Sequence, residues 1–342
     1  MKRLLVVKTS SLGDVVHAFP AVSDALAAGF QVDWVVEEAF ADVVALHPGV
    51  HQVIKVAWRR WRKNLGSSWE EMKVFRQALQ AEHYDLVIDS QGLIKSAIIA
   101  GLANGRSAGF SHTSAREPWA AFFYREHGRV PKGQHAIDRQ RQLFSTLLGY
   151  PLDGEQDSGL ANQGAASNRV MLLHGTTWAT KHWPEAMWVD LITRLRAEGL
   201  DPVVTWGNDD EEARAQRLVS AGAQALPKTS LAELAKTIAG VRLTISVDSG
   251  LGHLSAALGT PTVGLYGPTD GALTGCRGKH VTVLQGDTAC APCLQKRCRR
   301  YSGQTLYWND KEVWPPCFAS VHPDSVWRAA QTLLVDSGAM QP

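Results

Sequence analysis

The sequence predicts an α/β protein with two domains, each built on a parallel sheet wrapped by helices. Three observations lead to this fold class. The chain has 342 residues, which is long for a single hydrophobic core. Short apolar runs alternate with helical patterns in both halves of the chain. Between the halves, residues 153–168 are rich in Gly, Ala, Ser, Asn and Gln and have no periodicity, which is typical of a linker.

In the first half, the apolar runs predict four strands, at residues 3–8, 31–36, 52–56 and 84–89. A helix is expected over residues 15–28, interrupted early by Pro20. An amphipathic stretch over residues 68–82 precedes the fourth strand. These elements predict a first domain of residues 1–155.

The second half repeats the pattern, with strands expected at residues 169–173, 201–206, 243–247 and 262–266. Helical segments lie between them, and a last helical pattern covers residues 323–335. The predicted second domain is residues 168–322, followed by the terminal segment 323–342. Two such halves indicate two Rossmann-like domains whose parallel sheets face a cleft.

Composition excludes several classes of protein. Apolar residues make up 45% of the chain and charged residues 20%, which are ordinary globular values and exclude disordered, collagen-like and coiled-coil proteins. A net charge of +2 excludes a protein whose whole surface binds nucleic acid. The apolar run near the start is short and is followed at once by Lys8, so it predicts a buried strand rather than a signal peptide. No apolar stretch reaches the roughly 18 residues of a membrane span, and we expect a cytoplasmic protein that can visit a membrane surface.

The chain has five cysteines, an odd number that suits a reducing compartment. Four of them cluster late, at Cys290, Cys293, Cys298 and Cys317. The first pair has the spacing of zinc sites, but the later gaps match no common zinc module. We expect unbridged thiols in a loop, and a structural zinc or a redox pair is the alternative.

Polar turns follow three of the predicted strands. Residues 9–14 include Gly13 and Asp14, residues 174–184 carry hydroxyls and Lys181, and residues 248–254 begin with an aspartate and small residues. Ligands of open α/β sheets bind at the carboxyl ends of the strands. Hydroxyls, a lysine and a helix start suit the oxygens of a diphosphate, so the second domain predicts a nucleotide-diphosphate site. The alternative is a set of tight turns with capping aspartates, which for Asp14 stays open at this point.

Residues 8–14, 89–96, 176–184, 246–254 and 266–270 together resemble the lipopolysaccharide core heptosyltransferase family of glycosyltransferases, family 9. Residues 35–38 and 59–63 resemble its heptosyltransferase I branch most. The likeness runs in order along essentially the whole chain.

The resemblance implies a GT-B fold, ADP-heptose as donor, no metal cofactor and inversion at the anomeric carbon. It implies Kdo of the lipid A inner core as acceptor, peripheral attachment to the inner face of the inner membrane, and no nucleic-acid partner. It also implies that the terminal segment 323–342 packs back on the first domain.

Roles are carried over by matching positions. Asp14 corresponds to the base that acts on the acceptor hydroxyl. The residues implied to bind the donor are Thr176, Thr177, Lys181, Glu211, Asp248, Ser249, Gly250 and His253. Ser249 stands where the family has a threonine. Glu211 lies among four consecutive acids, so Glu212 is the alternative for the contact with the ribose.

The acceptor side is predicted around a basic run. Every side chain of residues 58–63 is a cation or an aromatic ring, and guanidinium groups match carboxylates and phosphates. A solvated loop face and single-stranded nucleic acid are the alternatives for this run. The predicted acceptor-binding residues are Ser11, Gly13, Arg59, Arg60, Arg62, Lys63, Lys95 and Arg116.

Two other functions remain open at this point. One is a sibling transferase that acts on a later core acceptor or uses another nucleotide sugar. The other is a non-catalytic module that binds anionic lipid or nucleic acid through residues 59–63. No Asp-x-Asp motif follows a predicted strand, which favours cationic side chains over magnesium at the diphosphate.

Overall fold

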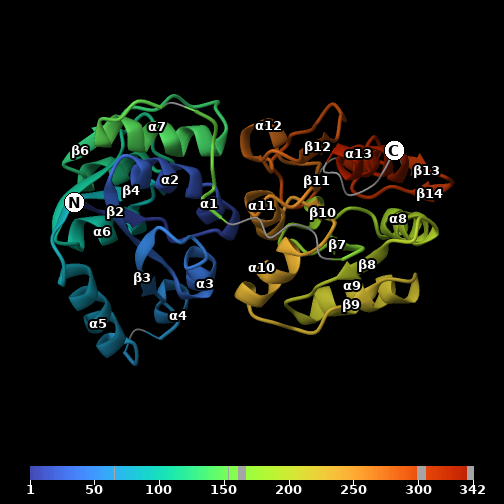
Figure 1. Ribbon diagram of the computed structural model, residues 1–342, viewed down its shortest axis with the longest axis horizontal. Helices are drawn as coiled ribbons and strands as arrows, with labels where there is room; N and C mark the ends of the chain where they lie inside the picture. Colours follow the sequence, from blue (N-terminus) through green and yellow to red (C-terminus); the bar gives the residue numbers. More distant parts are fainter. Residues whose placement is uncertain (65, 153, 161–166, 299–305, 337–342) are drawn as a thin grey trace. The chain divides into compact units, whose positions relative to one another are not determined.

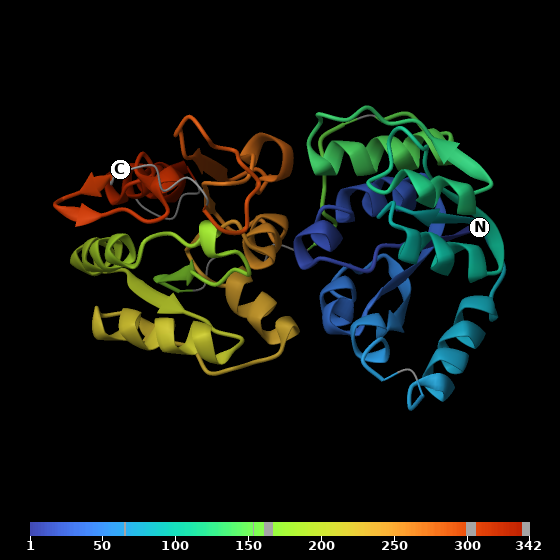
Figure 2. The same ribbon diagram turned by 180° about the vertical axis from the view of Figure 1, so that it is seen from behind.

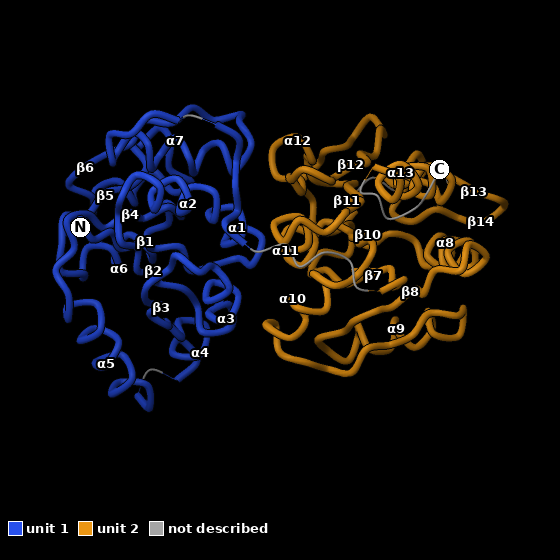
Figure 3. Tube along the Cα trace, viewed as in Figure 1, with its two compact units in different colours: residues 1–160 blue, residues 161–342 orange. Residues whose placement is uncertain are grey.

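The computed structural model describes residues 1–64, 66–152, 154–160, 167–298 and 306–336. The chain divides into two compact units, Met1–Leu160 (unit 1) and Ala161–Pro342 (unit 2), coloured separately in Figure 3. The division falls inside the predicted linker, of which residues 153 and 161–166 lie outside the described residues.

Unit 1 is built on a six-stranded parallel sheet of order β3-β2-β1-β4-β5-β6 (Figure 1). Its strands are β1 (Lys2–Val7), β2 (Phe30–Glu37), β3 (Val50–Val56), β4 (Tyr84–Asp89), β5 (Gly105–Phe110) and β6 (Glu126–Gly128). The last four residues of β1 are fully buried, as expected for a parallel strand covered on both faces. The sheet therefore carries the core of unit 1.

Helices cover both faces of this sheet. They are α1 (Leu12–Val16), α2 (Phe19–Ala27), α3 (Ala41–Val44), α4 (Trp58–Trp61), α5 (Trp69–Gln80), α6 (Ile94–Leu102) and α7 (Ala136–Leu148), with 3-10 turns η1 (Glu38–Phe40) and η2 (Pro118–Phe123). α5 and α6 pack on the face that holds Leu5 and Val7, and α2 packs against α7.

The expectation of one helix over residues 15–28 is wrong in one respect. The structure forms two helices, α1 and α2, with Pro20 in the first turn of α2. Proline lacks an N–H and is tolerated where the N–H groups of a helix have no partner within the helix. It therefore marks a new helix start rather than an interruption.

Unit 2 has a second six-stranded parallel sheet, of order β12-β11-β10-β7-β8-β9 (Figure 2, yellow-green to orange). Its strands are β7 (Arg169–Leu173), β8 (Asp201–Val204), β9 (Gln224–Ala225), β10 (Leu243–Val247), β11 (Thr262–Tyr266) and β12 (Val281–Gln285). Counted from the first strand of each unit, both sheets have the Rossmann order, which reverses beside the first strand. The prediction of two Rossmann-like domains with parallel sheets is thus confirmed.

The remaining elements of unit 2 are α8 (Glu185–Ala197), α9 (Asp209–Ser220), α10 (Leu231–Ala239), α11 (Gly250–Ala257), α12 (Gly271–Thr274), α13 (Pro323–Asp336), the 3-10 turns η3 (Ala179–Lys181) and η4 (Pro316–Phe318), and the hairpin β13 (Tyr307–Trp308) with β14 (Lys311–Glu312). Among the described residues, no helix is both long enough and apolar enough to cross a membrane.

The contacts that the structure describes for α13 lie in unit 2, and the packing of segment 323–342 on the first domain stays a prediction. The buried side chains of α13, Val326, Ala330, Leu333 and Leu334, belong to the core cluster of unit 2. The helix contacts α8 and the strands β10 to β12. The apolar face of α13 packs on the core of unit 2. Residues 337–342 of the terminal segment lie outside the described residues.

Two candidate sites at the carboxyl edges of the sheets

The loop after β1 in unit 1 is tied to the loop after β4. Lys8 is buried and its Nζ donates to the carbonyl oxygen of Ser90 at 3.0 Å. The backbone N–H and the hydroxyl of Thr9 both donate to Oε1 of Gln91, each at 2.8 Å. These two loops meet where the strand order reverses, which is the usual ligand position in such sheets.

Asp14 lies in the first turn of α1 and caps that helix. The backbone N–H and the hydroxyl of Ser11 both donate to Oδ2 of Asp14 at 2.9 Å, which forms a capping box. Burial alone would raise the pKa of Asp14, but the charge of Lys8 and the bonds from Ser11 hold it below its usual value. Asp14 therefore caps α1, and both capping bonds use a single carboxylate oxygen. Its role as the base stays a prediction.

Asp89 organises the loop after β4, a role that the sequence did not indicate. Ser96 Oγ and the Tyr124 hydroxyl donate to its Oδ2 at 2.7 and 2.6 Å. The N–H groups of Gln91 and Gly92 donate to its Oδ1 at 2.8 and 3.2 Å. Complete burial raises its pKa. A polar residue ending an otherwise buried strand was the available signal.

The structure brings some of the other predicted acceptor residues near Asp14. Ser11 and Gly13 belong to the same turn. The charge of Arg116 contributes to lowering the pKa of Asp14, and its backbone N would lie 3.4 Å from a Cβ added at Gly92. Gly92 has φ +67°, a conformation that favours glycine. Lys95 is set apart from this group, on the rim of a groove beside α5 and α6.

The basic run divides into residues with different partners. The Arg60 guanidinium forms ion pairs with Glu38 at 3.1 Å and with Glu71 at 2.7 Å. The Trp61 indole also donates to Glu71, at 2.9 Å. Arg60 therefore fastens α4 to η1 and α5, and this structural role competes with acceptor binding.

The other cations of the run are arranged differently. The Arg59 guanidinium lies over the Phe40 ring, 5.2 Å from its centroid, and its backbone N–H donates to Glu37 at 2.9 Å. Arg62 and Lys63 are exposed just after α4. These three are better placed than Arg60 to meet an anionic ligand.

In unit 2, Asp248 lies directly after β10 and is surrounded by donors. Lys181 Nζ and Thr269 Oγ1 both reach its Oδ2 at 2.6 Å, and His253 Nε2 lies 3.8 Å from Oδ1. Burial would raise the pKa of Asp248, but His253 and Lys181 lower it to about 2. Thr269 was named by the sequence only as part of residues 266–270, without a role.

His253 is buried beside Asp248 on α11. Burial would lower its pKa, but Cys276 and Asp248 raise the pKa to about 10. The site thus contains two positive groups, His253 and Lys181, around one carboxylate.

The loop after β7 approaches the same carboxylate. The Thr176 hydroxyl donates to the backbone carbonyl oxygen of Asp248 at 3.2 Å. Lys181 Nζ lies 4.5 Å from the centroid of the Trp178 ring, a cation–π distance. Thr177 is exposed in this loop. Lys181 and Thr176 from one loop and Asp248 from the other are therefore in contact. Their binding of the donor stays a prediction.

The start of α11 completes this edge. Ser249 is the N-cap residue, and its hydroxyl accepts from the N–H of Gly252 at 3.3 Å. A Cβ added at Gly252 would lie 2.5 Å from Ser246 Oγ, so only glycine allows this close approach of helix and strand. Gly250 is the first residue of α11. The first N–H groups of a helix have no hydrogen-bond partners within the helix. Together with the helix dipole, they attract anions.

Glu211 rather than Glu212 extends toward the loop after β7. Its Oε2 accepts from the N–H of Gly207 at 2.8 Å, and its Oε1 would lie 2.7 Å from a Cβ added at Gly175. The contact of Glu211 with a ribose stays a prediction.

All five cysteines are free thiols, Cys276 and Cys317 being buried. Burial, with the neighbouring cysteines, raises the pKa of Cys317 to about 12. Within the described ranges, no group of three or more His, Cys, Asp or Glu side chains is arranged to hold a metal ion.

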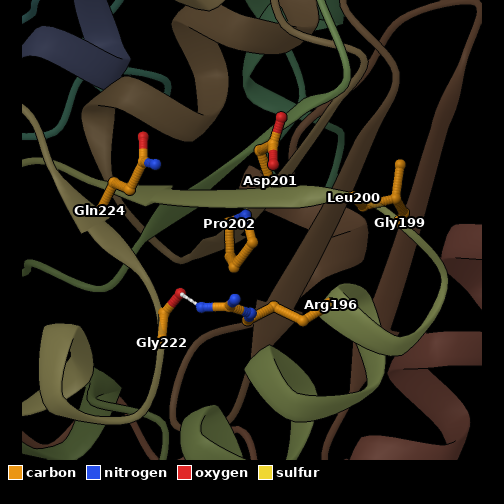
Figure 4. A pocket seen from close by; sticks show the side chains of 7 residues that line it. All are labelled: Arg196, Gly199, Leu200, Asp201, Pro202, Gly222 and Gln224. Carbon is orange, nitrogen blue, oxygen red and sulfur yellow. Dashed lines mark hydrogen bonds between the residues drawn. The ribbon is translucent and has the colours of Figure 1, made fainter.

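A hollow of about 170 Å³ lies at the other edge of the unit 2 sheet (Figure 4). It is lined by Arg196, Gly199, Leu200, Asp201, Pro202, Gly222 and Gln224. Arg196 donates to the carbonyl oxygen of Gly222 at 3.0 Å. Asp201 and Gln224 begin β8 and β9, so this hollow lies at the amino ends of the strands, away from Asp248.

Comparison with known proteins finds relatives that cover most of this chain. The family model of glycosyltransferase family 9 (heptosyltransferase) matches residues 72–302. Lipopolysaccharide heptosyltransferase 1 of Pseudomonas aeruginosa is 45% identical over 97% of this chain and 98% of its own length.

Two solved structures are also similar. E. coli heptosyltransferase WaaC with ADP is 45% identical, with a TM-score of 0.79 over 82% of this chain and 92% of that chain. The same enzyme with ADP-2-deoxy-2-fluoro heptose is 43% identical, with a TM-score of 0.77 over 83% and 93%. The chain therefore has the GT-B fold of these enzymes and belongs to glycosyltransferase family 9, the heptosyltransferases.

Proposed function

We propose that this glycosyltransferase transfers L-glycero-D-manno-heptose from ADP-heptose to Kdo of the lipid A–Kdo inner core, with inversion and without a metal ion. Support comes from the 45% identical relative described as lipopolysaccharide heptosyltransferase 1 and from the related structures that hold ADP and an ADP-heptose analogue. In this proposal unit 1 binds the acceptor and unit 2 binds the donor.

The reaction needs a base for the acceptor. The acceptor hydroxyl oxygen attacks the anomeric carbon of the heptose, and the bond from that carbon to the diphosphate oxygen breaks. Asp14 takes the hydroxyl proton, and ADP leaves with the electron pair. Because its low pKa keeps Asp14 ionised, and because the cap engages only Oδ2, its other oxygen can accept this proton.

The leaving group gains negative charge as the bond breaks. Lys181, the hydroxyls of Thr176 and Thr177, and the start of α11 at Ser249 and Gly250 supply positive charge and hydrogen-bond donors for the diphosphate. Asp248 and His253 hold Lys181 and the α11 turn in place. Glu211 is the candidate for the ribose.

One observation carries the proposal. Where the strand order reverses, unit 2 gathers a lysine, a threonine hydroxyl and a helix start around Asp248, and unit 1 places an ionised Asp14 at its own reversal point. A base in one unit and an anion site in the other are the two groups that metal-independent glycosyl transfer needs. We further propose that the protein acts peripherally on the cytoplasmic face of the inner membrane, where a lipid acceptor is presented.

The test is incubation with ADP-heptose and Kdo-terminated lipid A, with and without a chelator, followed by mass spectrometry. The expected product is the acceptor plus one heptose, with one ADP released per transfer and no loss of rate in the chelator. Transfer only to an acceptor that already carries heptose would favour the sibling function. Tight binding of phospholipid or RNA without ADP release would favour a non-catalytic module.

A further inference from the structure

An apolar groove of about 270 Å³ lies in unit 1 beside α4, α5 and α6. Its walls include Trp58, Trp69, Phe75, Ile98 and Leu102. Four of these remain exposed, at 39% for Trp58, 66% for Trp69 and 41% for both Ile98 and Leu102. Clustered exposed apolar side chains mark a surface that another molecule covers.

The charges of the groove select the kind of molecule. The charged side chains that line it are all cations: Lys73, Arg76 and Lys95. An apolar cavity with a cationic rim complements an amphiphile that has an anionic head and a hydrocarbon tail. Its volume is just below the roughly 300–1,000 Å³ of small-molecule pockets, which suits one chain rather than a whole lipid.

The groove is continuous with the predicted acceptor residues. Trp58 lines it and begins α4, which carries Arg59 and leads to Arg62 and Lys63. Lys95 lines it from α6. The groove therefore shares Lys95 with the predicted acceptor residues and is bordered by the first residue of the helix that carries Arg59.

We infer that this groove binds an acyl chain of the lipid acceptor, with Lys73, Arg76 and Lys95 at the phosphates of its head. The identity of the lipid rests on the proposed function. The groove thereby adds a site for the lipid tail to a reaction whose chemistry concerns only the sugars.

Direct binding tests this without the transfer reaction. Octyl, decyl and dodecyl phosphate, each below its micelle concentration, are titrated into the full chain while the tryptophan fluorescence is followed. Affinity should rise by up to about fourfold per methylene, since burial of a methylene contributes about 0.8 kcal/mol. Dodecyl maltoside, with a neutral head, should bind more weakly. Affinity independent of chain length would overturn the inference.

A matched pair of variants locates the binding. Ile98→Asp places a charge in the groove, and Val74→Asp places one on α5 outside it, at a side chain that is 62% exposed. Ile98→Asp should weaken dodecyl phosphate binding at least about tenfold, the loss of roughly two buried methylenes, and Val74→Asp should not. Equal loss in both variants, or in neither, would overturn the assignment and indicate a general membrane-binding surface.

A second measurement separates this inference from the proposed function. The parent should have a lower KM for acylated than for acyl-free Kdo acceptor, and Ile98→Asp should bring the two KM values together. If neither acceptor receives heptose, the proposed function fails, while the alkyl phosphate titration still decides on the groove. Heptose transfer with equal KM values in the parent would overturn the groove alone.

Discussion

The two units share a strand order, but the aspartates that end their fourth strands have different surroundings. At the carboxyl end of the fourth strand, unit 1 has Asp89 and unit 2 has Asp248. The groups that donate hydrogen bonds to Asp89 are neutral, and burial raises its pKa. Cations surround Asp248, and its pKa falls to about 2. The two aspartates differ in their direct partners, because Lys181 forms an ion pair with Asp248 and only neutral groups donate to Asp89.

The loops after the first strands show the same contrast. Unit 1 presents the carboxylate of Asp14 there, and unit 2 presents the ammonium of Lys181. The proposed base for the acceptor hydroxyl and the proposed cation for the diphosphate thus follow the first strand of each unit. Substitutions that remove the carboxylate of Asp14 or the ammonium of Lys181 test these two proposed roles.

The largest effect is expected from Asp14→Asn. Turnover should fall by about 100-fold or more, the usual contribution of a positioned base. ADP binding, measured by calorimetry, should stay near the parental value because the proposed donor site is in unit 2. Turnover close to that of the parent would leave Asp14 only the capping role that its bonds to Ser11 already show.

Lys181→Ala should have the next largest effect. A hydrogen bond to a charged group contributes about 1.5–3 kcal/mol, so kcat/KM for ADP-heptose should drop by about 10- to 100-fold, with both the donor's KM and kcat affected. Lys296→Ala is the matched control, because Lys296 also lies over the Trp178 ring, with its Nζ 5.8 Å from the centroid. Comparable losses in both variants would mean that the ring, and not the ion pair with Asp248, governs donor binding.

The basic run should show a smaller, salt-dependent effect. A cation near an anionic surface contributes about 1 kcal/mol, so Arg62→Ala and Lys63→Ala should each raise the acceptor's KM by about fivefold at low salt and less at high salt. The donor's KM should not change.

Arg60→Ala is the comparison for that pair of variants. It breaks the ion pairs with Glu38 and Glu71 and should act mainly on the placement of α4, seen as a change in proteolysis of the segment after α4. A gel-shift assay with single-stranded nucleic acid tests the third interpretation of the basic run, which is that it binds nucleic acid. Lost strand binding with normal heptose transfer would support nucleic acid as the ligand of the run.

The smallest effect at neutral pH is expected from Lys8→Met. The base must be ionised, so kcat/KM falls as the pH drops through the pKa of Asp14. Lys8 lowers that pKa, and its removal leaves burial to raise it, so the acid limb of the pH profile should move to higher pH. Ser90 keeps a donor in the variant, because Gln140 Nε2 also donates to its carbonyl oxygen at 3.0 Å. An unmoved acid limb would show that another group titrates there.

Much of the fold could be predicted from the sequence because local patterns were strong. β4, β7, β10 and β11 have the predicted bounds, since each is an apolar run between polar turns. β5, with a glycine at its start and another near its end, and the partly exposed β12 lack that pattern and were not predicted. The periodicity of α13 correctly gave a helix with an apolar face. Periodicity does not say which core receives that face.

For the candidate sites, the sequence could indicate residues within single segments but not the contacts between segments. Asp14, residues 176–181 and residues 248–253 follow strands and could be found by their position. Contacts between distant segments, such as Thr269 with Asp248 and Gln91 with Thr9, depend on how the loops pack. The ion pairs of Arg60 with Glu38 and Glu71 have the same origin, so the basic run alone could not show them.

The hydrogen bond from Tyr124 to Asp89 depends on the absence of a Cβ atom at Gly109 in β5, the strand beside β4. A Cβ at Gly109 would lie 2.5 Å from the Tyr124 ring, so the phenol crosses β5 only where there is no side chain. A single added methyl group at Gly109 would displace the ring and deprive an internal acid of its shortest hydrogen bond, at 2.6 Å. Substitution of Gly109 should therefore disturb this loop, although Gly109 has no side chain that could bind or react.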